Sequence, residues 1–518
     1  MLSEYFDVTL AHRSARVLFA EQQRMLFIPI LNNTAMNNNT TLQPAVVFEC
    51  FAEVNKVPRP SKKEEKMIAF LQDFAAKHGL PVKVDETGNV AISAPATPGY
   101  EHLRPVILQS HMDMVCEKHK DLDFNFETDA IQTYVDGEWL CAKGTTLGAD
   151  DGIGVAMQMA ILKSKDIEHG PIQCIFTRDE ETGLTGAMGM KDDFMEGDFL
   201  INLDSEDEGQ LFVSCAGGAR TTATFPWIDE AVPEDYYTFK VGVKGLVGGH
   251  SGDDINKKRA NANKLLVRFL CQVMEQTDLR LIDIQSGGLH NAIPRDGMAV
   301  CAVPFKNKED VRLWLNLYQA FVEDEYSVTE KQINFTLESV PSVPNALESA
   351  AMKRMLLSLQ AVHNGVFAMS QDMEGLVETS SNLASIHKVT EGVVVTTSQR
   401  SSVASARENM SLTVRAAFEL GGATVVTNEG YPGWKLNPNS EIVQIARDSY
   451  VRLFGKEPLV LAIHAGLECG LFSEKYPHLD MVSMGPTLRG VHSPDERLLI
   501  PTVKMVWDHL LDMLKHVG

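Results

Sequence analysis

The segment VILQSHMD, residues 106–113, carries the pattern that decides the predicted fold: a short, fully apolar run followed at once by polar side chains. Two later segments repeat it, namely 172–176, which runs into Asp179-Glu180-Glu181, and 199–203, which runs into Asp204. Short apolar runs of this kind are typical of buried strands, and the segment 153–162 between the first two has a helical period. Strands that alternate with helices predict an α/β fold with a mixed, mostly parallel sheet and helices on both faces.

The polar ends of these strands predict a functional site. In open α/β sheets, sites form beyond the carboxyl ends of the strands. One polar strand end is usually only a turn. Three in succession, all of them carrying His, Asp or Glu, favour a site.

The alternation of apolar strands with helices stops near Gly218 and resumes after the linker Gly430-Tyr431-Pro432-Gly433-Trp434. Between these points the periodicity predicts strands at 236–243, 281–284, 298–303 and 392–397 and helices at 261–276, 309–323 and 346–362. Beyond the linker it predicts a helix at 440–454, strands at 459–463 and 481–484, and a last helix at 501–517. We therefore expect a first domain split into 44–217 and 432–518, with an α+β unit inserted at 218–431.

The two ends of the first domain carry further expectations. Ser61 and Glu64 form the pattern of a capping box for a helix that Gly79 ends. Residues 1–43, with the polar run Asn37-Asn38-Asn39-Thr40-Thr41, are expected to be a poorly ordered, dispensable extension, and Met36 could be the physiological start.

Composition excludes several classes of partner. The 518 residues carry 47 Lys and Arg against 69 Asp and Glu, a net charge of −22. Such a chain repels phosphate backbones and anionic lipids, so nucleic acid and membrane surfaces are not expected partners. Its eight cysteines form no CxxC pair, which favours reduced thiols and a cytoplasmic location. No apolar run approaches the ~20 residues that a membrane span needs.

The candidate site residues are the types that divalent metals bind. In extended chain, His111 and Asp113 point the same way, so the carboxylate can hold the second ring nitrogen of a metal-bound imidazole. Glu180 and Glu181 diverge, so that one can bind a cation while the other transfers protons. Each residue alone has an ordinary explanation: a helix cap for Asp150, acidic turns for Glu180, Glu181 and Asp204, and a packed histidine for His492. Two histidines and three carboxylates together form the inventory of a dinuclear hydrolytic site, for which zinc is suited and manganese or cobalt could substitute.

Eight segments, in order along the chain, resemble the dinuclear-zinc peptidases and deacylases of the aminoacylase and carboxypeptidase type, most closely the aminoacyl-histidine dipeptidase (Xaa-His dipeptidase) branch. They are HMDMV at 111–115, GTTLGADDGIG at 144–154, TRDEETG at 177–183, LINLDSEDEG at 200–209, KGLVGGHSG at 244–252, NAIPR at 291–295, HAGLECGLF at 464–472 and GPTLRGVHSPDE at 485–496. The resemblance implies a zinc-exopeptidase-like catalytic domain and makes the unit at 218–431 its lid domain.

The resemblance also implies a role for each residue. His111 and Asp204 would bind one metal ion, Glu181 and His492 the other, and Asp150 would bridge the two. Asp113 would orient His111, and Glu180 would be the general base that activates a metal-bridging water. His250 in the lid would stabilise the oxyanion, while Asn291 and Arg400 would hold the substrate. For these three lid residues, a glycine-turn brace, a turn residue and a surface cation remain the respective alternatives. His464 and Glu468 are placed in the pocket wall or just behind the residues that line it, and no chemical role is assigned to them.

The predicted function is a dimetal dipeptidase that hydrolyses Xaa-His and related unblocked dipeptides, such as β-Ala-His. Asp204 supports this, since the resemblance associates Asp there with aminopeptidase-like branches and Glu with deacylases. Asp151 departs from many relatives, which carry Asn. An N-acyl amino acid deacylase and a catalytically silent metal-binding protein remain alternatives. The expected partner is a small dipeptide, and the lid could pair two chains into a homodimer.

Overall fold

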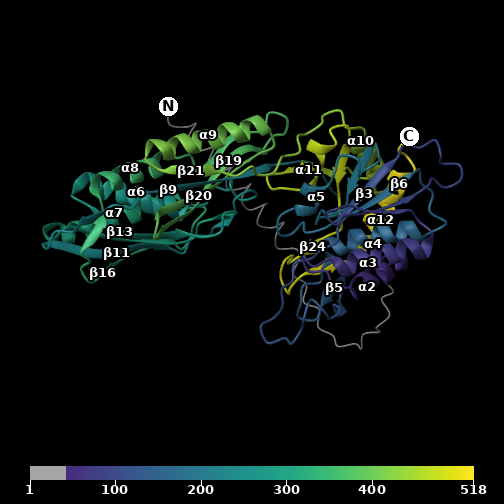
Figure 1. Ribbon diagram of the computed structural model, residues 1–518, viewed down its shortest axis with the longest axis horizontal. Coiled ribbons are helices and arrows are strands. Elements are labelled where there is room, and N and C mark those ends of the chain that lie inside the picture. The colour runs from purple at the N-terminus through teal and green to yellow at the C-terminus, as the bar shows by residue number, and fades with distance from the viewer. Residues whose placement is uncertain (1–41) are drawn as a thin grey trace, which may run out of the picture. The chain divides into compact units, whose positions relative to one another are not determined.

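In the computed structural model, which describes residues 42–518, the quoted segment contributes β3 (Val106–His111) to an eight-stranded sheet (Figure 1). The strand order is β1-β2-β6-β3-β7-β23-β8-β22. The other strands are β1 (Val82–Val84), β2 (Val90–Ala94), β6 (Ile172–Thr177), β7 (Phe199–Asn202), β8 (Gln210–Cys215), β22 (Leu459–Ile463) and β23 (Asp480–Ser483). Because β6, β3, β7 and β23 pair in parallel and β1, β2 and β6 pair antiparallel, the predicted mixed, mostly parallel sheet is confirmed.

Helices cover both faces of this sheet. On one face, Ile107, Ile175 and Leu200 pack with Phe472 of α11 (Glu468–Lys475) and with residues of α5 (Thr185–Gly189). On the other face, Ser110 lies against Gly154 of α4 (Ala149–Lys163). Figure 1 shows α4 beside α2 (Ala45–Val54) and α3 (Glu65–His78), with α5 and α11 across the sheet. The remaining helices here, α10 (Glu441–Phe454) and α12 (Ile500–Leu514), pack against each other.

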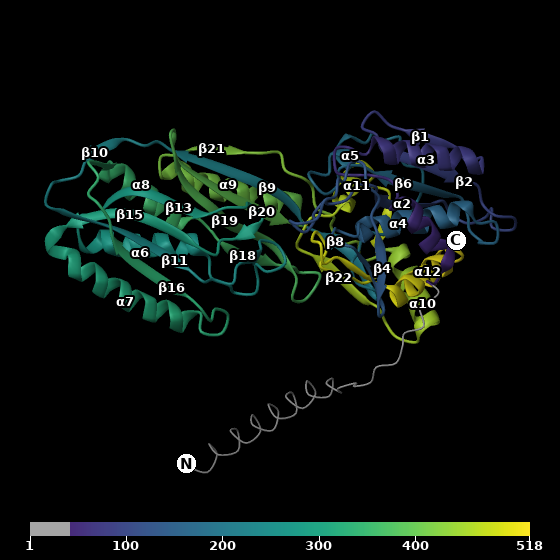
Figure 2. The ribbon, with the colours of Figure 1, turned by 90° about the horizontal axis from the view of Figure 1, so that it is seen from below.

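A second, antiparallel sheet takes all its strands from Gly217–Thr427, and its path is β16-β11-β15-β13-β19-β20-β9-β21, with β18 beside β19. Its strands are β9 (Gly217–Phe225), β11 (Tyr236–Lys244), β13 (Arg280–Gly287), β15 (Gly297–Pro304), β16 (Asn334–Ser339), β18 (Gly365–Met369), β19 (Val377–Val389), β20 (Gly392–Ser401) and β21 (Thr424–Thr427). One apolar cluster joins it to α6 (Ala262–Gln276), α7 (Lys308–Glu325), α8 (Ser349–Ala361) and α9 (Ala404–Leu420). Figure 2 shows these helices beside the strands of this sheet. Residues Gln43–Gly518 form one compact unit, so the division into catalytic and lid domains stays a prediction.

Short elements complete the described chain. They are the four-stranded sheet β24 (Leu488–Arg489), β25 (Arg497–Leu499), β5 (Trp139–Ala142) and β4 (Thr133–Asp136), the pairs β12 (Gly249–His250) with β14 (Ala292–Ile293) and β10 (Asp229–Ala231) with β17 (Asn345–Leu347), and the 3-10 helix η1 (Phe305–Asn307).

Two local predictions are wrong. The Ser61–Glu64 capping box does not form, because the Ser61 hydroxyl instead donates to Asp113 Oδ2 at 2.7 Å and α3 has no side-chain cap. The helix predicted at 346–362 starts only at Ser349, because Asn345–Leu347 pairs as a strand with Asp229–Ala231. In both cases a partner far along the chain competes with the local pattern.

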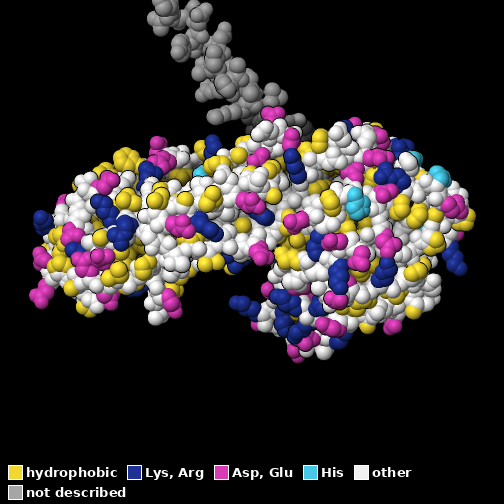
Figure 3. All heavy atoms as spheres, turned by 45° about the horizontal axis from the view of Figure 1, so that its top comes forward, with side chains coloured by type: hydrophobic (Ala, Val, Ile, Leu, Met, Phe, Trp, Pro, Cys, Tyr) yellow, Lys and Arg dark blue, Asp and Glu magenta, His cyan; other side chains and the backbone are white. Residues whose placement is uncertain are grey.

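Residues 42–518 also bear on the expectations for the extension, the cysteines, membrane spans and surface charge. The predicted extension at 1–43 lies almost wholly outside them. All eight cysteines lie within them and are free thiols. Between residues 42 and 518, no helix is long and apolar enough to cross a membrane. On the face drawn in Figure 3, acidic and basic side chains are interspersed.

Stability is expected to fall as pH falls, through the buried His509. Burial lowers the pKa of His509 to about 4, and Nε2 lies 2.8 Å from the Ala446 carbonyl, to which the neutral ring donates. The folded pKa is below the unfolded value of about 6.5, so the unfolded chain binds the proton more tightly. The contribution of the neutral ring to the free energy of unfolding is therefore complete above pH 6.5 and is lost progressively below it. Between pH 8 and 5 we expect a loss of about 2 kcal/mol from this group. Urea unfolding at both pH values measures it. His509→Gln keeps a donor but cannot titrate, so an unchanged pH dependence in this variant would contradict the assignment.

Candidate active site

The predicted metal ligands and Glu180 meet at one end of the first sheet. His111 is the last residue of β3, Glu180 and Glu181 follow β6, and Asp204 follows β7. Asp150 lies in the first turn of α4, and His492 lies in the turn before β25. Three neighbouring parallel strands thus deliver their polar ends to one edge, as the apolar runs predict.

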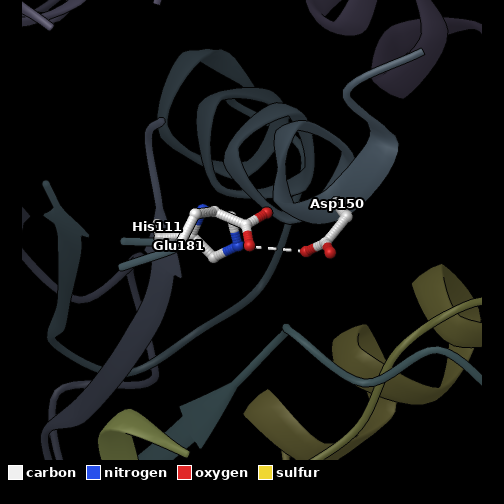
Figure 4. A group of neighbouring side chains, drawn as sticks. All are labelled: His111, Asp150 and Glu181. Carbon is white, nitrogen blue, oxygen red and sulfur yellow. Dashed lines mark hydrogen bonds and ion pairs between the residues drawn. The ribbon is translucent and has the colours of Figure 1, made fainter. Parts of the chain in front are cut away.

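Asp150 points toward His111 (Figure 4), and its two carboxylate oxygens face different histidines. Its Oδ1 is 3.0 Å from His111 Nε2, and its Oδ2 is 3.2 Å from His492 Nε2. His111 Nε2 is also 3.3 Å from Asp204 Oδ1, and His492 Nε2 is 3.0 Å from Glu181 Oε2. Ligand atoms of His111, Asp150 and Glu181 all lie within 4.8 Å of one another. The side chains therefore form two sets, each with one imidazole and one carboxylate, that share Asp150.

Asp113 lies behind His111 and is buried. Its Oδ1 is 3.4 Å from His111 Nδ1, the ring nitrogen that faces away from Asp150. The same carboxylate accepts the backbone N–H of Glu180 at 3.1 Å and that of Glu181 at 3.4 Å. It can therefore orient the imidazole and hold the backbone that carries both glutamates.

Negative charge is concentrated and buried at this edge. Burial raises the pKa values of Glu180 and Asp204 well above their usual range. Hydrogen bonds to Asp150 and Glu181 raise the pKa of His492 to about 11. The buried Oε1 of Glu181 has no hydrogen-bond partner among residues 42–518. An excess of buried carboxylates over imidazoles, with one oxygen left unpaired, fits the binding of divalent cations.

A pocket of about 470 Å³ lies between this edge of the first sheet and residues of the segment 218–431, which contains the second sheet. Its walls include Glu180, Glu181, His250, Asn291 and Arg400, so the structure brings the predicted base and the three predicted lid residues together.

Arg400 is only 7% exposed, which excludes its alternative explanation as a surface cation. It donates from Nη1 to Tyr431 Oη at 3.0 Å, and its Nη2 lies 3.4 Å from His250 Nε2. His250 Nδ1 accepts the backbone N–H of Gly252 at 3.3 Å, which is the contact that its alternative explanation as a glycine-turn brace predicts.

Sequence reasoning placed Glu468 and His464 near the pocket but did not predict their buried polar partners. Glu468 Oε2 accepts hydrogen bonds from Gln109 Nε2 at 2.6 Å and from Thr177 Oγ1 at 2.7 Å. Burial raises the pKa of Glu468 to about 7. His464 lies four residues before the start of α11. Its Nε2 is 2.7 Å from the Ser380 hydroxyl, and burial lowers its pKa to about 3. The signal in the sequence that could have revealed these contacts is Gln109, a polar residue inside an otherwise apolar strand.

A second group of carboxylates, Glu64, Asp113 and Asp179, lies beside the first. Its oxygens already have partners in the chain. Glu64 pairs with Arg178 at 2.6 Å, and Asp179 accepts hydrogen bonds from Thr182 and Thr185. These contacts make it a structural network.

Comparison with known proteins shows which family the chain belongs to. The model of Peptidase family M20/M25/M40 matches residues 107–516. The chain is 41% identical over 482 residues to the cytosol non-specific dipeptidase of Escherichia coli, covering 93% of this chain and 99% of that protein. The crystal structure of an aminoacylhistidine dipeptidase from Vibrio alginolyticus superposes with a TM-score of 0.86 at 43% identity, covering 93% of this chain and 98% of that one. A tripeptidase from Staphylococcus aureus, at 16% identity and a TM-score of 0.54 over 92% and 99% of the two chains, shares the fold. The chain belongs to Peptidase family M20/M25/M40.

Proposed function

We propose that this chain is a dimetal dipeptidase that hydrolyses Xaa-His and related unblocked dipeptides, such as β-Ala-His. Dipeptidase activity is supported by two relatives that are over 40% identical along nearly their whole length. The observation that carries the metal chemistry is Asp150, whose two oxygens each face a different histidine. A cytosolic location is proposed with it, since the Escherichia coli relative is named for the cytosol.

Five residues would hold two divalent cations. His111 with Asp204 would bind one, His492 with Glu181 would bind the other, and Asp150 would bind both. Their imidazole and carboxylate ligands suit zinc, with manganese or cobalt as substitutes. When bound, two such cations polarise a scissile carbonyl and lower the pKa of water.

Glu180 would be the general base. It lines the pocket next to Glu181, and burial raises its pKa, which favours a group that both takes and returns a proton near neutral pH. Its carboxylate would take a proton from the attacking water and pass it to the leaving amine. Asp113 would keep the backbone of Glu180 and the ring of His111 in place.

The residues on the opposite wall would hold the substrate. Arg400 would bind the terminal carboxylate with its planar guanidinium, and Asn291 would position the peptide. His250, beside Arg400, would stabilise the oxyanion of the tetrahedral intermediate. The unit at 218–431 would act as a lid that excludes water, and pairing of two such lids would make a homodimer.

A dipeptide panel tests the proposed function. We expect hydrolysis of Xaa-His above Xaa-Leu and Xaa-Gly, no hydrolysis of N-acetylated controls, loss of activity after chelation, and recovery with zinc or manganese. Amine release measured by chromatography gives the rates. Cleavage of the acetylated controls alone would make the chain a deacylase. Zinc binding without cleavage of any dipeptide would favour the silent metal-binding alternative.

A further inference from the structure

The segment that leads to Asp150 is held by a buried carboxylate from the far end of the chain. Glu496, only 3% exposed, accepts four consecutive backbone N–H groups. Its Oε2 accepts those of Leu147 at 2.8 Å and Gly148 at 3.0 Å, and its Oε1 accepts those of Ala149 at 2.8 Å and Asp150 at 3.3 Å. Glu496 lies four residues after His492, so one contact connects the turn of one histidine to the segment of the shared carboxylate.

A buried arginine holds the same segment from the other side. Arg59, 1% exposed, donates from Nη2 to the Gly148 carbonyl at 2.5 Å. Its Nη1 donates to the carbonyl of Asp113 at 2.7 Å and lies 3.3 Å from that of Met112. One guanidinium therefore connects the end of β3, which carries His111, to the segment that carries Asp150.

The backbone around Asp150 packs closely against the Arg59 guanidinium. Gly148 has φ +64°, and a Cβ there would lie 2.5 Å from Arg59 Nη2. A Cβ at Gly152 would also lie 2.5 Å from that atom. The backbone therefore approaches the guanidinium closely at two glycines, one on each side of Asp150.

We infer that Arg59 and Glu496 are positioning residues of the metal centre, which hold the segments of His111, Asp150 and His492 in register. The inference rests on the proposed metal centre. Neither side chain touches a proposed ligand side chain in these contacts; both act through backbone groups. If Asp150 binds both cations, a small rotation of residues 147–150 would weaken both sites together.

Two substitutions remove the bracing groups with little change of volume. Glu496→Gln leaves one amide oxygen for four N–H groups and places an NH₂ against the others. Arg59→Lys keeps the charge, but a single ammonium replaces the two nitrogens that bind separate carbonyls. Supporting contacts of this kind are worth about 10–100-fold in metal affinity, and we expect losses of that size for both variants.

Glu330→Gln is the matched control. Glu330 is 5% exposed and accepts the backbone N–H groups of Val247 at 2.8 Å and Ala260 at 2.9 Å. It resembles Glu496 in burial and in chemistry, but its partners belong to the segment 218–431, which holds none of the proposed metal ligands. It should lower Tm and leave the zinc constants unchanged.

The experiment is a titration of the full-length, chelator-stripped chain with Zn²⁺ against a chromophoric competitor, with Tm of each metal-free form as the measure of folding. Weaker zinc binding in Glu496→Gln and Arg59→Lys than in Glu330→Gln at matched Tm supports the inference, as does partial recovery in Glu496→Asp. Wild-type zinc constants in both bracing variants overturn it while the metal centre stands. If Glu496→Gln does not fold, Arg59→Lys and Glu496→Asp decide by the same comparison. A wild-type chain that binds no zinc overturns the metal centre itself.

Discussion

Replacement of Glu180 by glutamine is expected to lower dipeptide turnover by roughly 10²- to 10⁴-fold while the zinc content stays unchanged. The amide keeps the volume of the side chain but cannot take a proton from water and return it to the amine. Because Asp113 accepts the backbone N–H of Glu180, the main chain should stay in place in the variant. Initial rates on an Xaa-His dipeptide and elemental analysis measure the two quantities.

The matched control is Glu86→Gln, an exposed glutamate that pairs with Lys191 on the surface and should keep wild-type turnover. Preserved turnover in Glu180→Gln would remove its assignment as the base. Loss of zinc together with turnover would show that Glu180 contributes to metal binding instead.

Replacement of Asp150 by asparagine should cost both turnover and zinc. Each carboxylate oxygen of Asp150 faces one histidine, and an amide offers only one oxygen. Loss of the charge that two cations share should raise the barrier by about 4 kcal/mol or more, which is about 10³-fold in rate. Zinc titration of the stripped chain and dipeptide hydrolysis test this.

The neighbouring residue offers a close control. Asp151 is buried, and its Oδ1 accepts the backbone N–H of Gly154 at 3.2 Å, a hydrogen bond that the side-chain oxygen of asparagine can also accept. We expect near wild-type zinc binding and turnover in Asp151→Asn. Equal effects in the two variants would mean that Asp150 contributes no more to zinc binding and turnover than its neighbour. An Asp150→Asn protein that still binds two zinc ions tightly would exclude Asp150 as the bridge.

Sequence alone was sufficient where the determining signal is local. The apolar runs at 106–108, 172–176 and 199–203 all form strands of the first sheet. Their polar ends meet because parallel strands bring their carboxyl ends to one edge of a sheet. The family, and with it the candidate roles, followed from motifs at fixed spacing.

Sequence failed where buried polar residues replaced the expected periodicity. The strand β19 was not predicted, since Ser380, Ser381 and Asn382 are polar yet buried in the second sheet. An alternating pattern is visible only when one face of a strand contacts water.

Only the tertiary structure decided which distant groups pair. The sequence around Ser61 and Glu64 predicts a helix cap, but Ser61 donates to Asp113, 52 positions away. Glu496 accepts hydrogen bonds from backbone groups nearly 350 positions earlier, and no local sequence pattern predicts this contact. The physical reason is that periodicity and capping reflect the few residues next along the chain, whereas the partner of a buried polar group is chosen by whichever segment packs against it and leaves it no water.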